Sequence, residues 1–355
     1  MADMAGPQPM LRLVQGDVGC GKTVVAFLAL LAAVDSEWQA ALIAPTEVLA
    51  RQHYDTFRKW IDNAFDNARD KPQVVLLTGS TNAKEKDLIK QQLASGQAHI
   101  AIGTHALLAN RVDFSRLGLV VIDEQHRFGV EQRSEVSSQF TSLNTSAAPH
   151  MLSMTATPIP RTLAMVEEGI FALSAIEKGP EGRLPVETSV LAGDEGREKA
   201  YSTLQTALDR SSEAQAYVVC SLVEESTSSK TDGLTAVKKH MHFLQERLPH
   251  HRCTVLHGRM TGEEKAEALH SFRTGETRVL VATSIVEVGM DVPAATVMIV
   301  ENAERFGLAQ LHQFRGRVGR GNQKSQCLLL TNTEGAERLS IMAQSNNGFE
   351  IAERD

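Results

Sequence analysis

A glycine-rich loop near the start of the chain has the residue types and the spacing that phosphate chemistry needs. Residues 16–23 read Gly-Asp-Val-Gly-Cys-Gly-Lys-Thr and fit the phosphate-loop pattern G-x-x-x-x-G-K-[ST] in full. Glycines let the backbone wrap closely around a phosphate group, while the lysine reaches the β- and γ-phosphates and the threonine hydroxyl holds magnesium. The loop therefore predicts a site for a nucleoside triphosphate and Mg²⁺. The expected ligands are Gly16, Gly19, Cys20, Gly21, Lys22 and Thr23.

A pair of carboxylates supplies the second part of the predicted chemistry. Asp123 and Glu124 come directly after the apolar residues 117–122, which predict a buried strand. A carboxylate at the tip of such a strand can hold magnesium, and its neighbour can orient and deprotonate an attacking water. We assign the metal to Asp123 and the role of general base to Glu124. A charged surface turn is the alternative interpretation.

A cluster of arginines lies near the end of the chain. Arg317 and Arg320 are three residues apart, so on a helical turn they would project to one side, and Gly316 and Gly319 would allow another surface to approach closely. Arginines delivered across a domain interface can stabilise the charge that develops on a transferred phosphoryl group. A solvated basic face is the alternative interpretation of this cluster.

The elements that must position these residues alternate between strands and helices. The phosphate loop itself lies between a β-prone segment at residues 11–14 and a helical segment at residues 24–31. Such alternation predicts an α/β fold with mostly parallel sheets flanked by helices, and ligands at the carboxyl ends of the strands. Residues 178–185 hold two glycines and two prolines and predict a linker. The further expected strands are residues 40–44, 74–77, 99–102, 151–154, 216–220, 253–256, 278–282 and 296–300.

The composition excludes several classes of protein. At 355 residues, with 42% apolar and 22% charged residues, the chain is expected to be globular with two domains. It contains no apolar run of about 18 residues and no secretion signal, and its four cysteines form no C-x-x-C pair, so we expect a cytoplasmic protein with no membrane partner. The histidines and cysteine between residues 240 and 257 match no zinc spacing, so we expect no structural metal. A net charge of −7 means that nucleic-acid binding must be argued from motifs.

Taken in order, the motifs resemble those of superfamily 2 helicases of the DExH type. Residues 301–310, together with the stretches that follow Asp123 and Thr155, are similar to those of RecG-type helicases, which are ATP-dependent and act on branched DNA. The translocase module of the transcription-repair coupling factor is the nearest alternative, although that family usually has glutamate where Gln125 stands. The segments that carry the resemblance are residues 16–23, 44–46, 103–105, 123–126, 155–157, 282–291 and 313–320.

The resemblance implies two tandem RecA-like domains, a helicase ATP-binding domain at residues 1–180 and a helicase C-terminal domain at residues 181–355. It implies an ATP- and Mg²⁺-dependent motor on branched or forked DNA, in recombination and repair, in the bacterial cytoplasm at the nucleoid. Because family members carry a wedge domain before the phosphate loop and continue beyond the motor, we expect a motor-domain fragment. An ATP-responsive DNA clamp with little turnover and an RNA remodeller stay open as alternatives.

The resemblance also implies roles for individual residues. Five match positions that contact the nucleic-acid backbone without reading its sequence, namely Pro45, Thr46, Gly103, Thr104 and Thr283. Three match positions that couple the nucleotide site to movement, namely His126, Thr155 and Thr157. Gly289 and Asp291 match residues near the nucleotide, and Gln313 joins the two arginines in the catalytic group.

Overall fold

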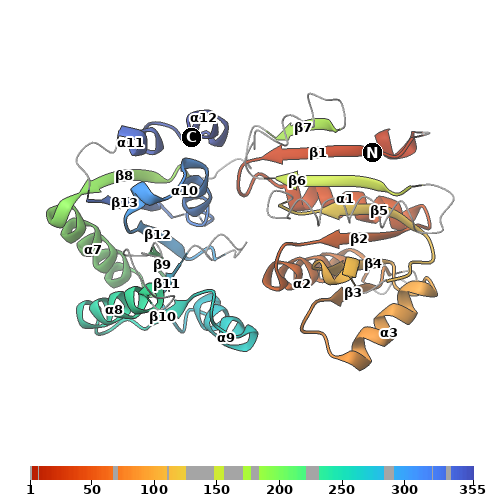
Figure 1. The fold of residues 1–355 in the computed structure, drawn as a ribbon, viewed down its shortest axis with the longest axis horizontal. Coiled ribbons are helices and arrows are strands. Elements are labelled where there is room, and N and C mark those ends of the chain that lie inside the picture. Colours follow the sequence, from red (N-terminus) through yellow and green to blue (C-terminus); the bar gives the residue numbers. More distant parts are fainter. Residues whose placement is uncertain are drawn as a thin grey trace. The chain divides into compact units, whose positions relative to one another are not determined.

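The computed structural model divides into two compact units, each built on one parallel sheet (Figure 1). The first unit contains Met1–Gly16 and Cys20–Gly179, and the second contains Asp17–Gly19 and Pro180–Asp355. Within the parts of the chain that the structure describes, no helix is long and apolar enough to cross a membrane. The described residues are 2–6, 8–66, 71–109, 112–124, 148–155, 171–176, 184–220, 232–283, 292–321, 323–332 and 337–355.

The sheet of the first unit has the strand order β3-β4-β2-β5-β6-β1-β7, and all its pairings are parallel. Its strands are β1 (Leu11–Gly16), β2 (Gln39–Ile43), β3 (Val74–Leu77), β4 (Ile100–Gly103), β5 (Leu117–Ile122), β6 (His150–Thr155) and β7 (Ala172–Ile176). The accompanying helices are η1 (Ala2–Ala5), α1 (Lys22–Asp35), α2 (Glu47–Ala64), α3 (Ala83–Ala94) and α4 (Ala106–Ala109).

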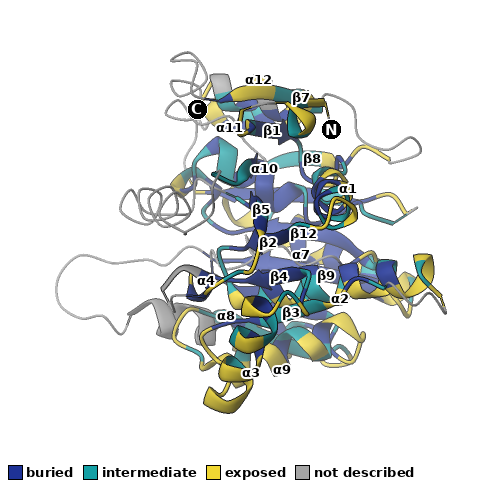
Figure 2. Cartoon of the chain, turned by 90° about the vertical axis from the view of Figure 1, so that its right-hand side faces the viewer, coloured by how far each residue is buried: buried dark blue, intermediate teal, exposed yellow. Residues whose placement is uncertain are grey.

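Apolar packing fixes these helices on the first sheet. Ile89 and Leu93 of α3 are buried in one cluster with the strand residues Ala41 and Ile43. Helices α1 and α2 contact each other through aromatic rings, and the centroids of Phe27 and Phe57 lie 5.0 Å apart. Full burial of a side chain such as Phe57 contributes about 1.5–3 kcal/mol to folding, which offsets part of the entropy lost on ordering the chain. Figure 2 shows central strands such as β2 and β5 as buried and much of α3 as exposed.

The second unit has the strand order β10-β11-β9-β12-β13-β8, again with parallel pairings. Its strands are β8 (Glu187–Ala192), β9 (Gln215–Val219), β10 (Cys253–Leu256), β11 (Val279–Ala282), β12 (Ala295–Val300) and β13 (Gln326–Thr331). Its helices are α7 (Gly193–Arg210), α8 (Asp232–Arg247), α9 (Gly262–Arg273), η4 (Ala303–Arg305), α10 (Leu308–Arg315), α11 (Glu337–Gln344) and α12 (Gly348–Glu353).

Alternate residues of β9 show how helices cover both faces of the second sheet. Ala216 and Val218 belong to a buried cluster with residues of α7 and α8, whereas Tyr217 and Val219 belong to a cluster with residues of α9, α10 and α11. Successive side chains of a strand point to opposite faces, so an all-apolar strand requires a helix layer on each side.

The two sheets repeat one topology, since β10, β11, β9, β12, β13 and β8 follow each other as β3, β4, β2, β5, β6 and β1 do. Even a buried hydrogen-bond pattern is repeated. Gln39, at the start of β2, donates from Nε2 to the carbonyl oxygens of Leu93 and Ala98 at 2.9 and 2.7 Å. Gln215, at the start of β9, donates in the same way to the carbonyl oxygens of Phe272 and Thr277.

The predicted α/β class with parallel sheets is confirmed, and the bounds of β3, β5 and β10 agree with the expected ranges to the residue. Several strands and helices were not predicted, among them β7, β8, β13 and α10. One expectation is wrong. Arg317 and Arg320 do not lie on a helical turn, because α10 ends at Arg315 and Gly319 takes a φ of 72° that no right-handed helix contains.

Candidate functional site

The carboxyl edge of the first sheet brings together most of the predicted residues that the structure describes. Gly16 ends β1, Pro45 and Thr46 follow β2, and Asp123 follows β5. Thr155 ends β6 and is fully buried there. Because all these strands are parallel, the residues that follow them meet at one edge. Four predicted residues, namely His126, Thr157, Gly289 and Asp291, lie outside the described residues.

The phosphate loop needs its glycines for two different reasons. A Cβ on Gly16 would lie 2.5 Å from Sγ of Cys20 in the loop and 3.0 Å from Cβ of Ile176 on β7, so the crowding at the end of β1 favours glycine. Gly19 and Gly21 have φ angles of 80° and 100°, in the left-handed region that favours glycine. Gly21 is also the N-cap of α1 and offers no side-chain oxygen to the first N–H groups of the helix. That helix end is suited to bind an anion from outside.

Lys22 is the first residue of α1, and its Nζ donates a hydrogen bond to the carbonyl oxygen of Gly16 at 2.7 Å. The lysine side chain therefore lies over its own loop. Burial raises the pKa of Asp123, whereas the positive charge of Lys22 is among the influences that lower it.

Asp123 is a buried carboxylate with a specific partner. Oδ2 of Asp123 accepts a hydrogen bond from Nε2 of His53 at 2.8 Å, and the backbone N–H of Asp123 donates to the carbonyl oxygen of Ile43 at 2.9 Å. Burial opposes ionisation, but the hydrogen bond and charge of His53 and the charge of Lys22 outweigh it. The pKa of Asp123 therefore lies below its ordinary value. The group is an ionised carboxylate, the form that a divalent cation binds.

His53 was not predicted, although one signal was available. It lies on α2 four residues after Leu49 and four before Phe57, and all three side chains are buried. A histidine on the apolar face of a helix requires a polar partner, and this partner is the metal candidate itself.

Glu124 has an unusual backbone conformation for its residue type. Its φ is 50°, in the left-handed region, and holding a residue other than glycine there costs about 1–3 kcal/mol. The Glu124 side chain is half-buried, whereas that of Asp123 is buried. The two adjacent carboxylates therefore lie in different surroundings.

The predicted nucleic-acid contacts lie in the turns after the strands. Thr46 is the N-cap of α2, and its Oγ1 accepts from the N–H of Leu49 at 3.4 Å. Thr104 and Thr283 hold equivalent places after β4 and β11, and both are buried. A Cβ on Gly103 would lie 2.1 Å from the carbonyl oxygen of Leu77, so only glycine fits there.

The arginine segment follows α10 in the second unit. Gln313 and Arg317 are buried, and Nε of Arg320 donates to the carbonyl oxygen of Gly316 at 3.1 Å. A Cβ on Gly319 would lie 2.7 Å from Cγ2 of Val186, so the turn packs tightly on its neighbour. The arginines are held by a compact turn rather than displayed on a solvated helix face.

The segment of α11 and α12 holds α10 at both ends, which the sequence did not predict. The carboxylate of Asp355 accepts from the N–H groups of Leu308 and Ala309 at 2.7 and 3.0 Å and so caps the start of α10. Near its end, NH1 of Arg315 donates to the carbonyl oxygens of Met342 and Ser345, both at 2.8 Å. Gln313 thus lies within a helix with fixed ends, and Arg317 and Arg320 follow it.

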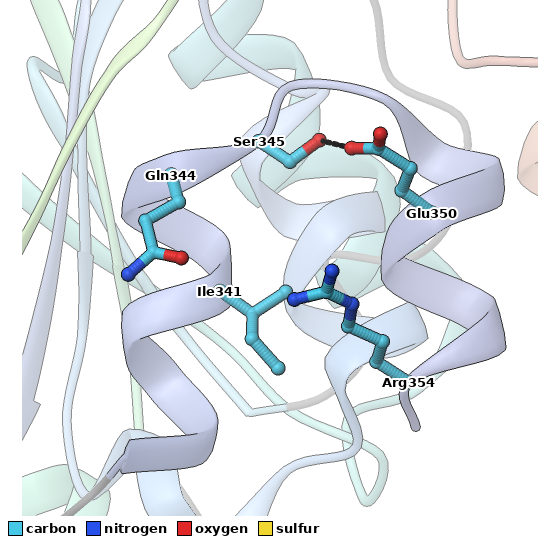
Figure 3. A pocket seen from close by; sticks show the side chains of 5 residues that line it. All are labelled: Ile341, Gln344, Ser345, Glu350 and Arg354. Carbon is cyan, nitrogen blue, oxygen red and sulfur yellow. Dashed lines mark hydrogen bonds between the residues drawn. The ribbon is translucent and has the colours of Figure 1, made fainter.

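A small cavity lies between α11 and α12 (Figure 3). Its volume is about 100 Å³, below the range of about 300–1,000 Å³ that ligand pockets occupy. Ser345 donates a hydrogen bond to Glu350 across its rim. The cavity accommodates water rather than a nucleotide.

Comparison with known proteins agrees with this geometry. A family profile described as DEAD/DEAH box helicase matches residues 6–166, and one described as helicase conserved C-terminal domain matches residues 199–322. An ATP-dependent DNA helicase RecG from Synechocystis sp. is 48% identical over 358 residues, which cover 100% of this chain and 41% of that protein. RecG helicases are thus homologues of this chain over its full length.

Other relatives and solved structures support this similarity and the fold. The RECG1 homologue of Arabidopsis thaliana, described as chloroplastic/mitochondrial, is 45% identical over 99% of this chain and 38% of its own length. A solved structure of RecG bound to a three-way DNA junction has a TM-score of 0.78 and 38% identity, over 99% of this chain and 44% of that chain. Dbp5 of S. cerevisiae, bound to RNA and ADP BeF3, has a TM-score of 0.68 at 17% identity, which shows the fold alone.

These comparisons confirm the predicted RecG-type resemblance and the two RecA-like folds. The chain spans less than half of the length of the two named relatives.

Proposed function

We propose that this chain is the ATP-driven motor of a RecG-type helicase and translocase that acts on branched or forked DNA in recombination and repair. The observation that carries the proposal is the ionised, buried Asp123, held by His53 beside a complete phosphate loop. Similarity to RecG, one structure of which is bound to a three-way DNA junction, supports the choice of substrate. Binding to chromosomal DNA would place the protein at the bacterial nucleoid.

The residues present fit ATP and Mg²⁺. The uncapped start of α1 and the glycine backbone of the loop form a cradle for phosphates, and Lys22 is placed to exchange the Gly16 carbonyl for a phosphate oxygen. Asp123 and the hydroxyl of Thr23 would hold magnesium. When bound, the ion supplies positive charge that offsets the negative charge of the phosphates.

Hydrolysis requires three further tasks, each of which has a candidate in this chain. Glu124 would orient a water molecule and accept its proton. Arg317 and Arg320 would stabilise the negative charge of the transferred phosphoryl group, and Gln313 would help to position the reacting groups. Thr155, with His126 and Thr157, is proposed to couple the nucleotide state to movement.

The same strand ends supply the proposed DNA contacts. Thr104 and Thr283 are buried, so their turns would meet the DNA backbone through main-chain groups, as would the turn at Gly103. Pro45 and Thr46 are half-buried and remain accessible at the start of α2. Short groups of this kind make contacts that do not depend on base sequence.

ATP turnover by the chain, measured with forked, linear duplex and single-stranded DNA, tests the proposal. We expect magnesium-dependent hydrolysis that falls by about 10³-fold or more in Lys22→Ala and Glu124→Gln. Unchanged turnover in Glu124→Gln would exclude that residue as the base. Nucleotide-dependent DNA binding without turnover would instead show an ATP-responsive clamp, and preference for RNA in competition would contradict the DNA assignment.

A further inference from the structure

A buried cluster of polar side chains lies at the carboxyl end of β12 in the second unit. Glu301 follows this strand directly and is buried. NH2 of Arg197 donates to its Oε2 at 2.7 Å, and the hydroxyl of Tyr201 donates to its Oε1 at 2.5 Å. Nε2 of His240 lies 2.7 Å from the Tyr201 oxygen and 3.9 Å from Oε1 of Glu301. The cluster joins α7 and α8 to the strand end.

The protons of this cluster can be assigned. Burial, and next the charge of Glu301, raises the pKa of Tyr201 well above its ordinary value, so the phenol keeps its proton and gives it to Glu301 in a hydrogen bond. The Tyr201 oxygen then accepts from Nε2–H of His240. Burial lowers the pKa of His240, which is therefore neutral near pH 7, and burial raises the pKa of the adjacent Cys220 thiol to about 12. Arg197 thus supplies the charge that balances Glu301.

Glu301 holds the place in the second sheet that Asp123 holds in the first. The N–H of Glu301 donates to the carbonyl oxygen of Val219 at the end of β9, at 2.8 Å, just as the N–H of Asp123 donates to Ile43 at the end of β2. The equivalence extends to the surrounding helices. α7 follows β8 as α1 follows β1, and α8 contributes His240 as α2 contributes His53.

The chain leads from Glu301 to α10 through a short and well-held connection. Asn302 has a φ of 49°, and Ala303 is fully buried. Phe306 packs edge-on against Phe314 of α10, with ring centroids 5.3 Å apart. NH2 of Arg338 donates to the carbonyl oxygen of Phe306 at 2.6 Å. A displacement of Glu301 is therefore passed on to α10 rather than absorbed by a loose loop.

We propose that Glu301 is a positioning residue, held by Arg197 and Tyr201, which sets the placement of α10 and thereby of Gln313, Arg317 and Arg320. In the second unit, the Arg197 guanidinium neutralises the strand-end carboxylate, the task that a metal ion has beside Asp123 in the first. The cluster occupies the topological place of the nucleotide site with the protein's own side chains. The inference rests on the proposed ATPase function.

Glu301→Gln tests this role with little change of shape. The new amide would place an N–H donor opposite the donor NH2 of Arg197, and the carboxylate charge that holds the Arg197 guanidinium would be lost. Tyr201 could still donate to the amide oxygen. Because the phosphate loop is untouched, we expect kcat for ATP to fall by about 10- to 100-fold, with KM within about twofold of the wild-type value. Arg197→Lys keeps a charged donor opposite Glu301, so its kcat should fall less than that of Glu301→Gln.

A matched control is the exposed pair of Arg252 and Glu276, whose NH1 and Oε1 lie 2.9 Å apart in the same unit. Glu276→Gln removes the same kind of charge from an exposed ion pair, and exposed pairs contribute little. Its kcat and KM should equal those of the wild type. A double variant, Arg197→Met with Glu301→Gln, should be no slower than Glu301→Gln alone, because the two groups act as one unit.

Hydrogen exchange gives a readout that does not depend on turnover. In Glu301→Gln, the amides of α10 should exchange about tenfold faster, whereas those of β9 and β11 should keep their wild-type rates. If the wild-type chain has no ATPase activity, the proposed function is contradicted. The hydrogen-exchange test of Glu301 can still be carried out in that case. Unchanged exchange in α10, equal acceleration across the sheet, or a wild-type kcat in Glu301→Gln of an active chain would each overturn the inference.

Discussion

At the end of β5 the first unit places Asp123, and at the same position of the second unit β12 is followed by Glu301. Both carboxylates are buried, both receive their backbone support from the neighbouring strand, and both have a histidine from the next helix nearby. Their counter-charges differ. Asp123 has His53 in direct contact and the charge of Lys22 nearby, whereas Glu301 has Arg197 in direct contact.

The difference teaches how one fold can serve two purposes. The strand order and the buried glutamines at the start of β2 and β9 are the same in both units, so the amino edge carries the common architecture. The carboxyl edge carries the residues that differ, and there the proposed ligand site of the first unit corresponds to an internal ion pair in the second. Replacing a ligand by a tethered side chain removes the entropy loss of binding and makes that charge balance permanent.

Asp123→Asn should give the largest loss of ATP turnover, because it removes the carboxylate charge that is proposed to bind the metal. We expect ATP turnover to fall by about 10³-fold or more, well beyond the effect expected for Glu301→Gln. Turnover measured across a magnesium titration checks this, with circular dichroism to confirm that the fold persists. If Asp123→Asn and Glu301→Gln lower kcat equally, the proposed difference between the two edges is wrong.

Gly103→Ala should give the largest loss of stability. The new Cβ would lie 2.1 Å from the carbonyl oxygen of Leu77, and overpacking of this kind costs about 3 kcal/mol. The equivalent residue of the second sheet is Ala282, which pairs with Leu256 as Gly103 pairs with Leu77. Ala282→Gly should therefore cost only about 1 kcal/mol.

Urea unfolding can separate these two changes. Both tryptophans, Trp38 and Trp60, belong to the first unit, so tryptophan fluorescence follows the first unit while circular dichroism follows both. Gly103→Ala should shift the fluorescence transition to lower urea, and Ala282→Gly should leave it in place. A Gly103→Ala protein with the wild-type fluorescence midpoint would contradict the close approach of β3 and β4.

His53→Ala should give a smaller effect that depends on pH. The pKa of Asp123 is lowered in the folded state, so its ionised form stabilises the first unit at pH values above about 3.9, the unfolded value, and this contribution is lost as pH falls through the folded pKa. Without His53 the folded pKa rises. The acid-unfolding midpoint should move to higher pH, and stability at pH 7 should fall by about 1–3 kcal/mol.

The pH titration is again read by tryptophan fluorescence. The control is His242→Ala, because His242 is largely exposed and pairs with Glu246 one turn away on α8. An acid-unfolding midpoint that is identical in His53→Ala and the wild type would show that the hydrogen bond to Asp123 does not support the first unit.

Residues whose role depends on local spacing could be predicted from the sequence. The phosphate loop and Asp123 were found because a pattern or a strand end identifies them within a few residues. His53 was missed because its partner is 70 residues away, and Asp355 because it caps a helix 47 residues before it. Such pairings arise from the tertiary fold, which a one-dimensional pattern does not contain.

The missed elements have the same kind of cause. β7 lies at a sheet edge, and its mostly exposed or half-buried residues lack the apolar run that marked the central strands. α10 has only eight residues and holds buried polar side chains such as His312 and Gln313, so the period of its apolar residues is weak. The turn at residues 316–320 was taken as helical because spacing alone does not show that Gly319 has a positive φ.

The left-handed backbone at Glu124 sets stability against activity. Glycine would adopt this conformation without steric penalty, and asparagine would adopt it more easily than glutamate does. In a library of variants selected only for thermal stability, Glu124 should therefore be replaced early. The selected proteins would be more stable but would lack the proposed base. The residue marks a place where an optimised fold and a working motor require different sequences.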